Sequence, residues 1–238
     1  MIDLHSHVLP GLDDGAADET AALAMCRMAA EDGIATMVAT PHLFGGIGVA
    51  RPGVIPVAAK RLRLRLAEEQ IDLDLRCAGE MPLMENAVDL YRSGEWPAYD
   101  AGRRYLLLEM PPIWNGLGAL RDTIFQLRLE GATPILAHPE RLDLLDDLET
   151  VEGLRTQGAL LQITATCLFA SGSREHGRAV EWIRRGWVHA VASDAHDVEF
   201  RPPRLTAARR WLADHFGPRI ADELTCDNPR KILCGEPL

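Results

Sequence analysis

The first fourteen residues of the chain, MIDLHSHVLPGLDD, contain two histidines and three aspartates. Residues 2–7 alternate as a β-strand does, which places Asp3, His5 and His7 on one face and allows His5 and His7 to chelate one ion. Such polar side chains are unfavourable in a strand that begins a core unless something binds them. The opening stretch therefore predicts a metal site at the end of the first strand.

The same chemistry recurs at the ends of other apolar, strand-like runs. These runs cover residues 2–7, 34–39, 71–77, 104–109, 134–138, 160–164 and 188–193. A histidine or a carboxylate ends or follows every run except 160–164. The candidate metal ligands are His5, His7, Asp14, His42, Glu80, Glu109, His138, Asp194 and His196, with Asp13 beside Asp14. The other histidines, His176, His189 and His215, do not lie at strand ends.

Stretches with helical spacing separate these strands. The clearest helices run from an N-cap at Asp18 to a stop at Gly33, over 116–131 and over 174–186. The segment KRLRLRLAEEQ (60–70) alternates like a strand, but Ala59, Leu62 and Leu66 also form a helical stripe, and its place between two strands favours a helix. Residues 43–56 are rich in glycine and proline, which indicates a loop.

Alternation of strands and helices is typical of parallel βα units. Because the composition does not change along the chain and no Gly/Ser linker interrupts it, we interpret residues 1–238 as one domain. The fold class is α/β, and the simplest architecture is a TIM-like barrel of seven strands, with an open doubly wound sheet as the alternative. In such barrels the reactive groups lie at the C-terminal ends of the strands, so the candidate ligands should converge on one rim.

The ligand set contains imidazoles and carboxylates but no sulfur, which suits Mn²⁺, Fe or Zn²⁺, with Mg²⁺ also possible. It is too large for one octahedral ion that keeps an open position, and it suits two or three ions bridged by a carboxylate. A purely structural metal cluster is the alternative. Closed structural sites, however, usually have four ligands and are often rich in sulfur.

Two arginines closely follow candidate ligands, Arg141 in HPER and Arg201 in SDAHDVEFRPP. Each should lie on a loop above the same rim, and the guanidinium fork matches phosphate oxygens. Either arginine alone is equally well explained as a salt-bridging surface residue. Together, beside a metal cluster, they favour phosphate chemistry, and we expect both to act in catalysis.

Cys167 and Arg174 form a rival phosphate-binding pattern. The cysteine-dependent tyrosine phosphatases use the spacing C-x5-R, whereas this chain has C-x6-R and no histidine before the cysteine. One extra residue changes which backbone amides converge on a phosphate. We therefore do not expect Cys167 to be a nucleophile.

The composition excludes several classes of function. A net charge of −10 and a pI near 5.3 disfavour a nucleic-acid partner. The chain has no apolar run of about 18 residues, so we expect no membrane insertion, and its first residues lack a signal-peptide pattern. Five scattered cysteines without a CxxC pair argue against a disulfide framework and a zinc ribbon. We expect a cytoplasmic protein.

Several longer stretches carry a family resemblance: DLHSHVLPGLDDGA, ATPH, RYLLLEMP, PILAHPER, GALLQITA, VHAVASDAH, RPP and DNPRKIL. They span nearly the whole chain. With them the sequence resembles the PHP superfamily (polymerase and histidinol phosphatase). Within it, the chain resembles the bacterial metal-dependent protein-tyrosine phosphatases of the CpsB/CapC type, which act with capsule and exopolysaccharide tyrosine kinases.

This resemblance implies a distorted seven-stranded barrel with three metal ions, most often manganese, and hydrolysis of phosphotyrosine in a protein such as a cognate bacterial tyrosine kinase. It assigns His5, His7, Glu80 and Asp194 to the first ion, Glu80, Glu109 and His138 to the second, and Asp14, His42 and His196 to the third. Arg141 and Arg201 match the family's phosphate-binding arginines. The chain departs from the family at GEMPLM, at Leu43 and at ATCLFASG, which concerns substrate contacts at the rim rather than the ligands.

Three other functions share parts of this pattern. A small-molecule phosphatase of the same superfamily, acting for example on histidinol phosphate, would use the same metals with a pocket for a small amine. The acidity of the chain disfavours a polymerase-associated nuclease module. A non-catalytic metal-binding module is disfavoured because the ligand set is complete.

Overall fold

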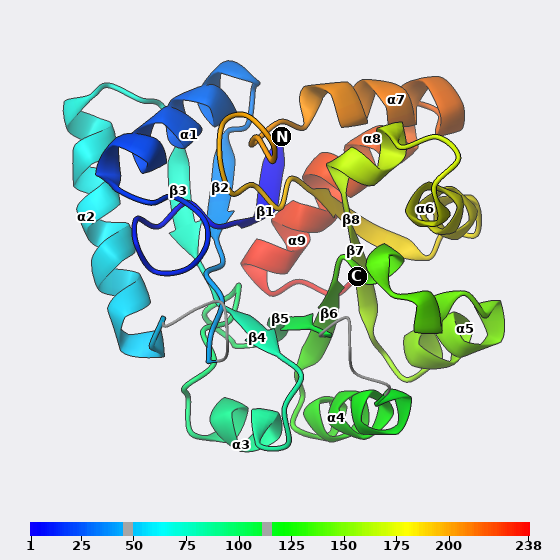
Figure 1. Cartoon of the computed structure of the whole chain (residues 1–238). Helices are drawn as coiled ribbons and strands as arrows, with labels where there is room; N and C mark the ends of the chain where they lie inside the picture. The colour runs from blue at the N-terminus through cyan, green and yellow to red at the C-terminus, as the bar shows by residue number, and fades with distance from the viewer. Residues whose placement is uncertain (45–49, 111–115) are drawn as a thin grey trace.

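The computed structural model describes residues 1–44, 50–110 and 116–238 (Figure 1). Its strands are β1 (Ile2–Ser6), β2 (Thr36–Ala39), β3 (Asp74–Cys77), β4 (Glu80–Pro82), β5 (Tyr105–Glu109), β6 (Thr133–Ala137), β7 (Leu160–Thr164) and β8 (Val188–Ala192). Every pair of neighbouring strands is parallel. Parallel strands need crossover connections, and helices supply most of them here. The predicted α/β class is therefore confirmed.

The helices are α1 (Glu19–Glu31), α2 (Ile55–Glu68), α3 (Ala87–Arg92), α4 (Leu117–Leu129), α5 (Leu148–Thr156), α6 (Arg174–Arg184), α7 (Thr206–Phe216), α8 (Pro218–Asp222) and α9 (Asn228–Cys234). In Figure 1, α1 to α7 surround the strands, whereas α9 lies in the middle. The predicted N-cap is confirmed, because the Asp18 carboxylate accepts a hydrogen bond from the Ala21 amide at 2.9 Å. None of the described helices has the length and apolar character needed to cross a bilayer.

The strands form two sheets, in the orders β1-β2-β3 and β4-β5-β6-β7-β8. The sheets meet on both sides. On one side Ser6 bridges Ala195, and on the other His42 bridges Glu80. Since the described strands follow one another in chain order, they lack the reversal that marks a doubly wound sheet. The arrangement is a distorted barrel.

Each of the seven predicted runs overlaps a strand, but the third run differs from the prediction. Glu80 does not end β3; it begins β4, after a break at Ala78 and Gly79. A side chain at Gly79 would place its Cβ only 2.6 Å from Cδ1 of Leu43, so the glycine allows this close approach. The break redirects the chain so that Glu80 pairs with both β5 and the segment after β2.

The segment before β3 contains a predicted helix and a predicted loop. Residues 60–68 lie in α2, where Ala59, Leu62 and Leu66 are buried, so the predicted helix is confirmed. The loop predicted over 43–56 is too long at its end, because Ile55 and Pro56 already belong to α2. Residues 45–49 of this loop lie outside the described part of the chain.

Apolar side chains fill the inside of the ring. Ile232 and Leu233 of α9 pack in one cluster with residues from five strands, namely Leu4, Val38, Leu107, Ile135 and Ala190. The larger cluster lies between the strands and the surrounding helices. Apolar packing on both faces holds the strand ends in fixed positions, and these ends carry the polar residues described next.

Candidate metal centre

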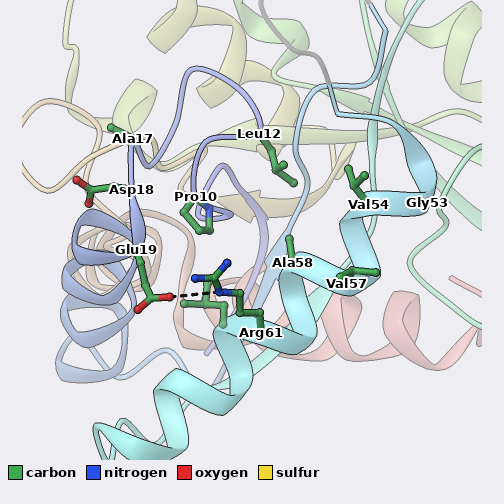
Figure 2. Close-up of a pocket in the computed structure, with 11 residues that line it drawn as sticks. Pro10, Leu12, Ala17, Asp18, Glu19, Gly53, Val54, Val57, Ala58 and Arg61 are labelled. Carbon is green, nitrogen blue, oxygen red and sulfur yellow. Dashed lines mark ion pairs between the residues drawn. The ribbon is translucent and has the colours of Figure 1, made fainter.

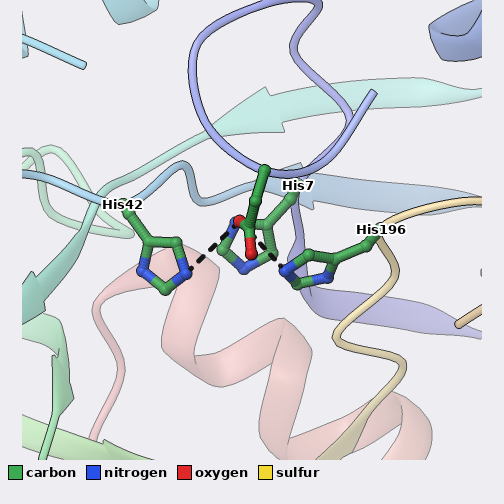
Figure 3. Close-up of side chains that lie close together, drawn as sticks. His7, His42 and His196 are labelled. Atoms are coloured by element: carbon green, nitrogen blue, oxygen red, sulfur yellow. Dashed lines mark ion pairs between the residues drawn. The ribbon is translucent and has the colours of Figure 1, made fainter. Parts of the chain in front are cut away.

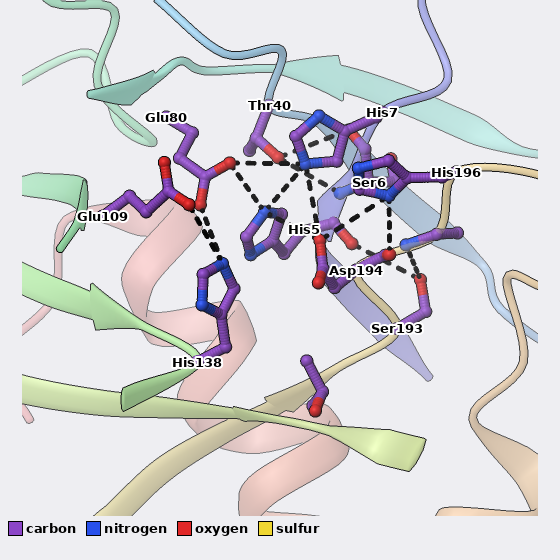
Figure 4. Close-up of polar contacts among 12 residues, drawn as sticks. His5, Ser6, His7, Thr40, Glu80, Glu109, His138, Ser193, Asp194 and His196 are labelled. Carbon is purple, nitrogen blue, oxygen red and sulfur yellow. Dashed lines mark hydrogen bonds and ion pairs between the residues drawn. The ribbon is translucent and has the colours of Figure 1, made fainter. Parts of the chain in front are cut away.

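His5 of β1 and His7 just after it meet two distant carboxylates, Glu80 at the start of β4 and Asp194 after β8 (Figure 4). The Nε2 atoms of His5 and His7 lie 3.1 Å apart. Oε2 of Glu80 lies 3.2 Å from the first and 3.3 Å from the second. Oδ1 of Asp194 lies 3.3 and 3.4 Å from the same two atoms. All four side chains are buried, so four donor atoms face one another away from bulk water.

Glu80 extends this group in two directions. Its Oε2 atom also lies 3.0 Å from Nδ1 of His42, while its Oε1 atom lies 3.2 Å from Nε2 of His138. Glu109 completes this side, with its carboxylate oxygens 3.5 Å from Nδ1 of His42 and 3.9 Å from Nε2 of His138. The two oxygens of Glu80 thus face different sets of imidazoles, which is the geometry of a bridging carboxylate.

A third group lies at the outer edge of the cluster. Oδ1 of Asp14 is 3.3 Å from Nε2 of His196 and 3.6 Å from Nε2 of His42. The ring of His7 lies beside both histidines, with centroids 4.0 Å from His196 and 4.5 Å from His42 (Figure 3). The structure therefore brings together every histidine and carboxylate that the sequence predicts as a metal ligand.

The grouping differs in detail from the one that the resemblance implied. Donor atoms close enough to share an ion form four overlapping sets: His5, His7 and Asp194; His5, Glu80 and His138; His42, Glu80 and Glu109; and His7, Asp14, His42 and His196. His42 thus approaches Glu109 and Glu80 as well as Asp14. Its ring lies between two groups because its Nδ1 and Nε2 atoms point to opposite sides.

Hydrogen bonds on the far side of two rings orient their nitrogen lone pairs. Nδ1 of His5 donates to Oε1 of Gln162 at 2.8 Å, and Nδ1 of His196 donates to the backbone carbonyl of Asp194 at 2.9 Å. Because both partners are acceptors, the proton of each neutral ring lies on Nδ1, and Nε2 presents its lone pair to the cluster. This is the orientation that metal-binding histidines adopt.

Asp13 holds two of the histidines at once. Its Oδ2 atom accepts from Nδ1 of His7 at 2.7 Å and from the backbone amide of His42 at 3.1 Å. The Asp13 side chain is fully buried. The loop packs so closely that a Cβ on Gly15 would lie 1.9 Å from the carbonyl oxygen of His7, so only glycine fits there.

The electrostatics of the cluster fit a bound cation. Both oxygens of Glu80 and Oδ1 of Asp194 are buried without a hydrogen-bond partner among the described residues. Burial alone would raise the pKa of Glu80, but attraction to the protonated forms of His5 and His138 outweighs it and holds that pKa well below its usual range. The pKa of Asp194 is also well below its usual range, since His5 and Arg141 outweigh its burial. Ionised, unpartnered oxygens surrounded by imidazole nitrogens are a suitable donor set for divalent metals.

Two of the candidate ligands have left-handed backbone conformations. His138 follows β6 with φ of 33°, and Asp194 follows β8 with φ of 53°. Non-glycine residues adopt such values at a cost, and they cluster at functional sites where the surrounding structure enforces them. The turn of the backbone at these positions directs each side chain into the cluster.

Both predicted arginines reach the same carboxylate. Nη2 of Arg141 donates to Oδ2 of Asp194 at 2.7 Å, and Nη2 of Arg201 donates to the same oxygen. Their side chains are 38% and 36% exposed, so a solvent-borne ligand can reach them. Burial would lower the pKa of Arg141, but the charge of Asp194 outweighs it and the pKa is raised.

Arg178 of α6 fixes the loop that carries Arg141. Its guanidinium donates to the backbone carbonyl of Glu140 at 2.6 Å, to Asp143 at 2.6 Å and to Asp146 at 2.7 Å. The arginine side chain is only 6% exposed. Three charge-assisted or buried hydrogen bonds from one planar group hold the segment after β6 in a single conformation.

Cys167 has none of the features of a nucleophilic thiol. It is buried, its Sγ donates to the carbonyl of Thr164 at 2.9 Å, and burial raises its pKa. Nucleophilic cysteines have lowered pKa values. Arg174 lies close to Asp143 and Asp146, at 3.6 and 3.8 Å, and is largely exposed.

Sequence reasoning missed three residues that support the site. Gln162 lies in the run 160–164, the one run without an ionisable candidate, although a polar residue inside an apolar strand was a signal. Asp13 lies beside the predicted ligand Asp14, but the sequence pattern assigns it no role. For Arg178, the sequence offered no signal, because its partners lie more than thirty positions earlier in the chain.

The chain is similar to known proteins along nearly its whole length. The family model described as capsular polysaccharide synthesis, CpsB/CapC, matches residues 1–234. Tyrosine-protein phosphatase YwqE of Bacillus subtilis is 32% identical over 237 residues, which cover 98% of this chain and 91% of the relative. Tyrosine-protein phosphatase CpsB of Streptococcus pneumoniae is 29% identical over 242 residues, covering 98% of each chain.

A solved structure extends the likeness to three dimensions. It comes from a description of YwqE and CpsB as unique metal-dependent tyrosine phosphatases, and it matches with a TM-score of 0.91 at 28% identity. The match covers 100% of this chain and 96% of the other. Because the family model and the relatives both span nearly the whole chain, the protein belongs to the CpsB/CapC family of capsular polysaccharide synthesis.

Proposed function

We propose that this chain hydrolyses phosphotyrosine in proteins by means of a metal centre. The observation that carries the proposal is the shared position of Asp194. One of its oxygens faces His5 and His7, and the other accepts from Arg141 and Arg201. A cluster of metal-type donors and a pair of phosphate-type donors are thus adjacent. The names of the relatives, tyrosine-protein phosphatases, agree with this chemistry.

The donor set would hold three ions, for which Mn²⁺ is the proposed metal and Fe, Zn²⁺ and Mg²⁺ are compatible alternatives. The proposed ligands are His5, His7, Glu80 and Asp194 for the first ion, Glu80, Glu109 and His138 for the second, and Asp14, His42 and His196 for the third. Bound ions would supply Lewis acidity and lower the pKa of water, so that a nucleophile forms at neutral pH. Glu80 would hold two ions together, since its two oxygens face different imidazoles.

Arg141 and Arg201 would bind the oxygens of the phosphoryl group. A guanidinium has five N–H donors, and the contact with Asp194 uses only part of them. The remaining N–H groups belong to partly exposed side chains, so a phosphate ester can reach them. The hydrogen bonds to Asp194 hold both guanidinium groups in fixed positions. The two arginines would therefore stabilise the charge that moves onto the phosphoryl oxygens in the transition state.

The proposed substrate is a phosphorylated bacterial tyrosine kinase that controls capsule or exopolysaccharide synthesis. The family description, capsular polysaccharide synthesis, supports this assignment. The proposed location is the cytoplasm. All five cysteines are free thiols, which suits a reducing compartment.

The test combines elemental analysis with turnover of a phosphotyrosine peptide. We expect about three metal ions per chain, loss of turnover after chelation, and recovery with Mn²⁺. His42→Ala should lose both metal and turnover, whereas His215→Ala, which changes an exposed histidine of α7, should lose neither. Full turnover of a chelated, metal-free sample would contradict the proposal, and so would faster hydrolysis of histidinol phosphate than of the peptide.

A further inference from the structure

A groove lies between the loop after β1 and the N-terminal half of α2 (Figure 2). Its volume is about 470 Å³. The loop contributes Pro10 and Leu12, and the helix side contributes Val54, Val57 and Ala58, so the floor and walls are largely apolar. Val54 and Val57 are 42% and 69% exposed, although aliphatic side chains are usually buried. The groove is therefore an apolar surface open to solvent.

The rim of the groove is polar. Arg61 reaches across it toward Glu19, with 3.6 Å between Nε and the carboxylate (Figure 2). The Arg61 side chain is 80% exposed, so this ion pair contributes little stability and can be exchanged for another partner. An apolar trough with exchangeable donors and acceptors at its edge is suited to a polypeptide, which presents both side chains and backbone amides.

The groove and the proposed metal centre are built from the same loop. Leu12 lines the groove, and Asp14, two residues later, lies 3.3 Å from His196. In a βα barrel the C-terminal ends of the strands and the N-terminal ends of the following helices lie on one face. Both sites therefore open on the same face. The Cα atoms of Leu12 and Asp14 are at most about 7 Å apart, and an extended peptide advances about 3.3 Å per residue, so residues a few positions from a phosphotyrosine at the metal centre can reach the groove.

We propose that this groove binds an aliphatic or aromatic side chain of the substrate polypeptide, located one to three residues from the phosphotyrosine. The inference rests on the proposed phosphotyrosine phosphatase activity and adds a determinant of substrate selection. Because one loop carries both Leu12 of the groove and Asp14 of the metal centre, the occupant we propose is the peptide held by its phosphoryl group. A second copy of the chain is less suitable, because a stable interface buries at least about 1,200 Å², far more than a trough for one or two side chains provides.

The test compares two phosphotyrosine peptides of equal length and charge, one with leucines and one with serines at the positions flanking the phosphotyrosine. The wild-type protein should hydrolyse the leucine peptide with a kcat/KM about fivefold or more higher, since burial of a few methylene groups supplies that factor. The double variant Val54→Ser/Val57→Ser should lose this preference, mainly through KM. Its turnover of p-nitrophenyl phosphate, which has no flanking residues, should be unchanged.

The matched control is Leu64→Ser, which removes an aliphatic side chain of α2 that is 59% exposed and lies outside the groove. It should keep the wild-type preference. Equal preference in the double variant and the wild type would overturn the groove assignment while leaving the phosphatase proposal intact. If the wild type hydrolyses no aryl phosphate, the phosphatase proposal itself fails. A change of oligomeric state in the double variant, with unchanged peptide preference, would identify the groove as a contact between copies and reject the peptide.

Discussion

Arg141 and Arg201 donate hydrogen bonds to the same atom, Oδ2 of Asp194, although they lie on loops that follow different strands. The other oxygen of Asp194 faces the imidazoles of His5 and His7. One oxygen of this carboxylate therefore orients two guanidinium groups, and the other belongs to the proposed metal centre. Since either arginine still contacts Asp194 when the other is removed, the two should be redundant in orienting Asp194 but not in binding phosphate.

Replacing Arg201 tests whether this arginine is needed to bind phosphate. Arg201→Ala should lower kcat on a phosphotyrosine peptide by about 10²–10³, because a preorganised charged donor is lost. Arg201→Lys should recover only part of this loss, since a point charge lacks the planar fork. Metal content and melting temperature should stay near wild type, because Arg141 still holds Asp194. Normal turnover of Arg201→Ala would reject the phosphate-binding role.

Replacing both arginines tests the redundancy. In Arg141→Ala/Arg201→Ala, Oδ2 of Asp194 loses both donors, so the carboxylate should no longer be held toward His5 and His7. We expect reduced metal content in the double variant and near-normal content in each single variant, measured by elemental analysis after dialysis. Equal metal content in all three variants would show that the arginines do not position Asp194.

Asp13 should act as a positioning residue for the metal centre, because it holds both His7 and the backbone of His42. Partners of this kind typically contribute about 10- to 100-fold to metal affinity. Asp13→Asn should weaken metal retention by about that factor, measured by competition with a chelator. Asp18→Asn, which changes the exposed N-cap of the same loop, is the control and should retain metal as the wild type does. Unchanged affinity in Asp13→Asn would refute the role.

Cys167 should be dispensable for catalysis. Cys167→Ser keeps a hydroxyl that can donate to Thr164, as the thiol does, so the fold should be retained. We expect turnover within a few-fold of wild type, measured with metals bound in both proteins. Trapping of a phosphocysteine, or loss of turnover at full metal content, would reverse this conclusion.

His189 should make the stability of the fold depend on pH. Burial lowers its pKa in the folded state from 6.5 to about 4, and its Nδ1 accepts from the amide of Leu161 at 3.1 Å. Between these values the unfolded chain binds more protons than the folded one. The stabilising contribution of neutral His189 is therefore complete above pH 6.5 and is lost as the pH falls toward 4.

This dependence can be isolated with His189→Asn, which keeps an acceptor for Leu161 but does not titrate. Urea unfolding of both proteins in chelator-containing buffer should give a free energy of unfolding that declines more steeply from pH 6.5 to 4 in the wild type. Parallel pH profiles for the two proteins would mean that His189 does not contribute.

Local patterns along the chain are enough to predict which side chains meet in the candidate centre. His5 and His7 follow from strand alternation, and residues such as His138 and Asp194 follow from their positions at strand ends. In a parallel barrel the C-terminal ends of all strands lie on one face, so a local pattern is enough to predict a distant encounter. The helix over 60–68 was also predictable, because its apolar stripe depends on neighbours along the chain.

The orientation of those side chains, in contrast, depends on contacts between segments that are far apart in the chain. The contact of His5 with Gln162 joins residues 157 positions apart, and Arg178 reaches three residues of another segment. The break at Gly79, the position of His42 between two groups and the groove beside Leu12 likewise depend on how separate segments pack. Strand alternation and strand ends are local properties of the chain, whereas a hydrogen bond between remote strands depends on register, bends and close packing, which no local pattern records.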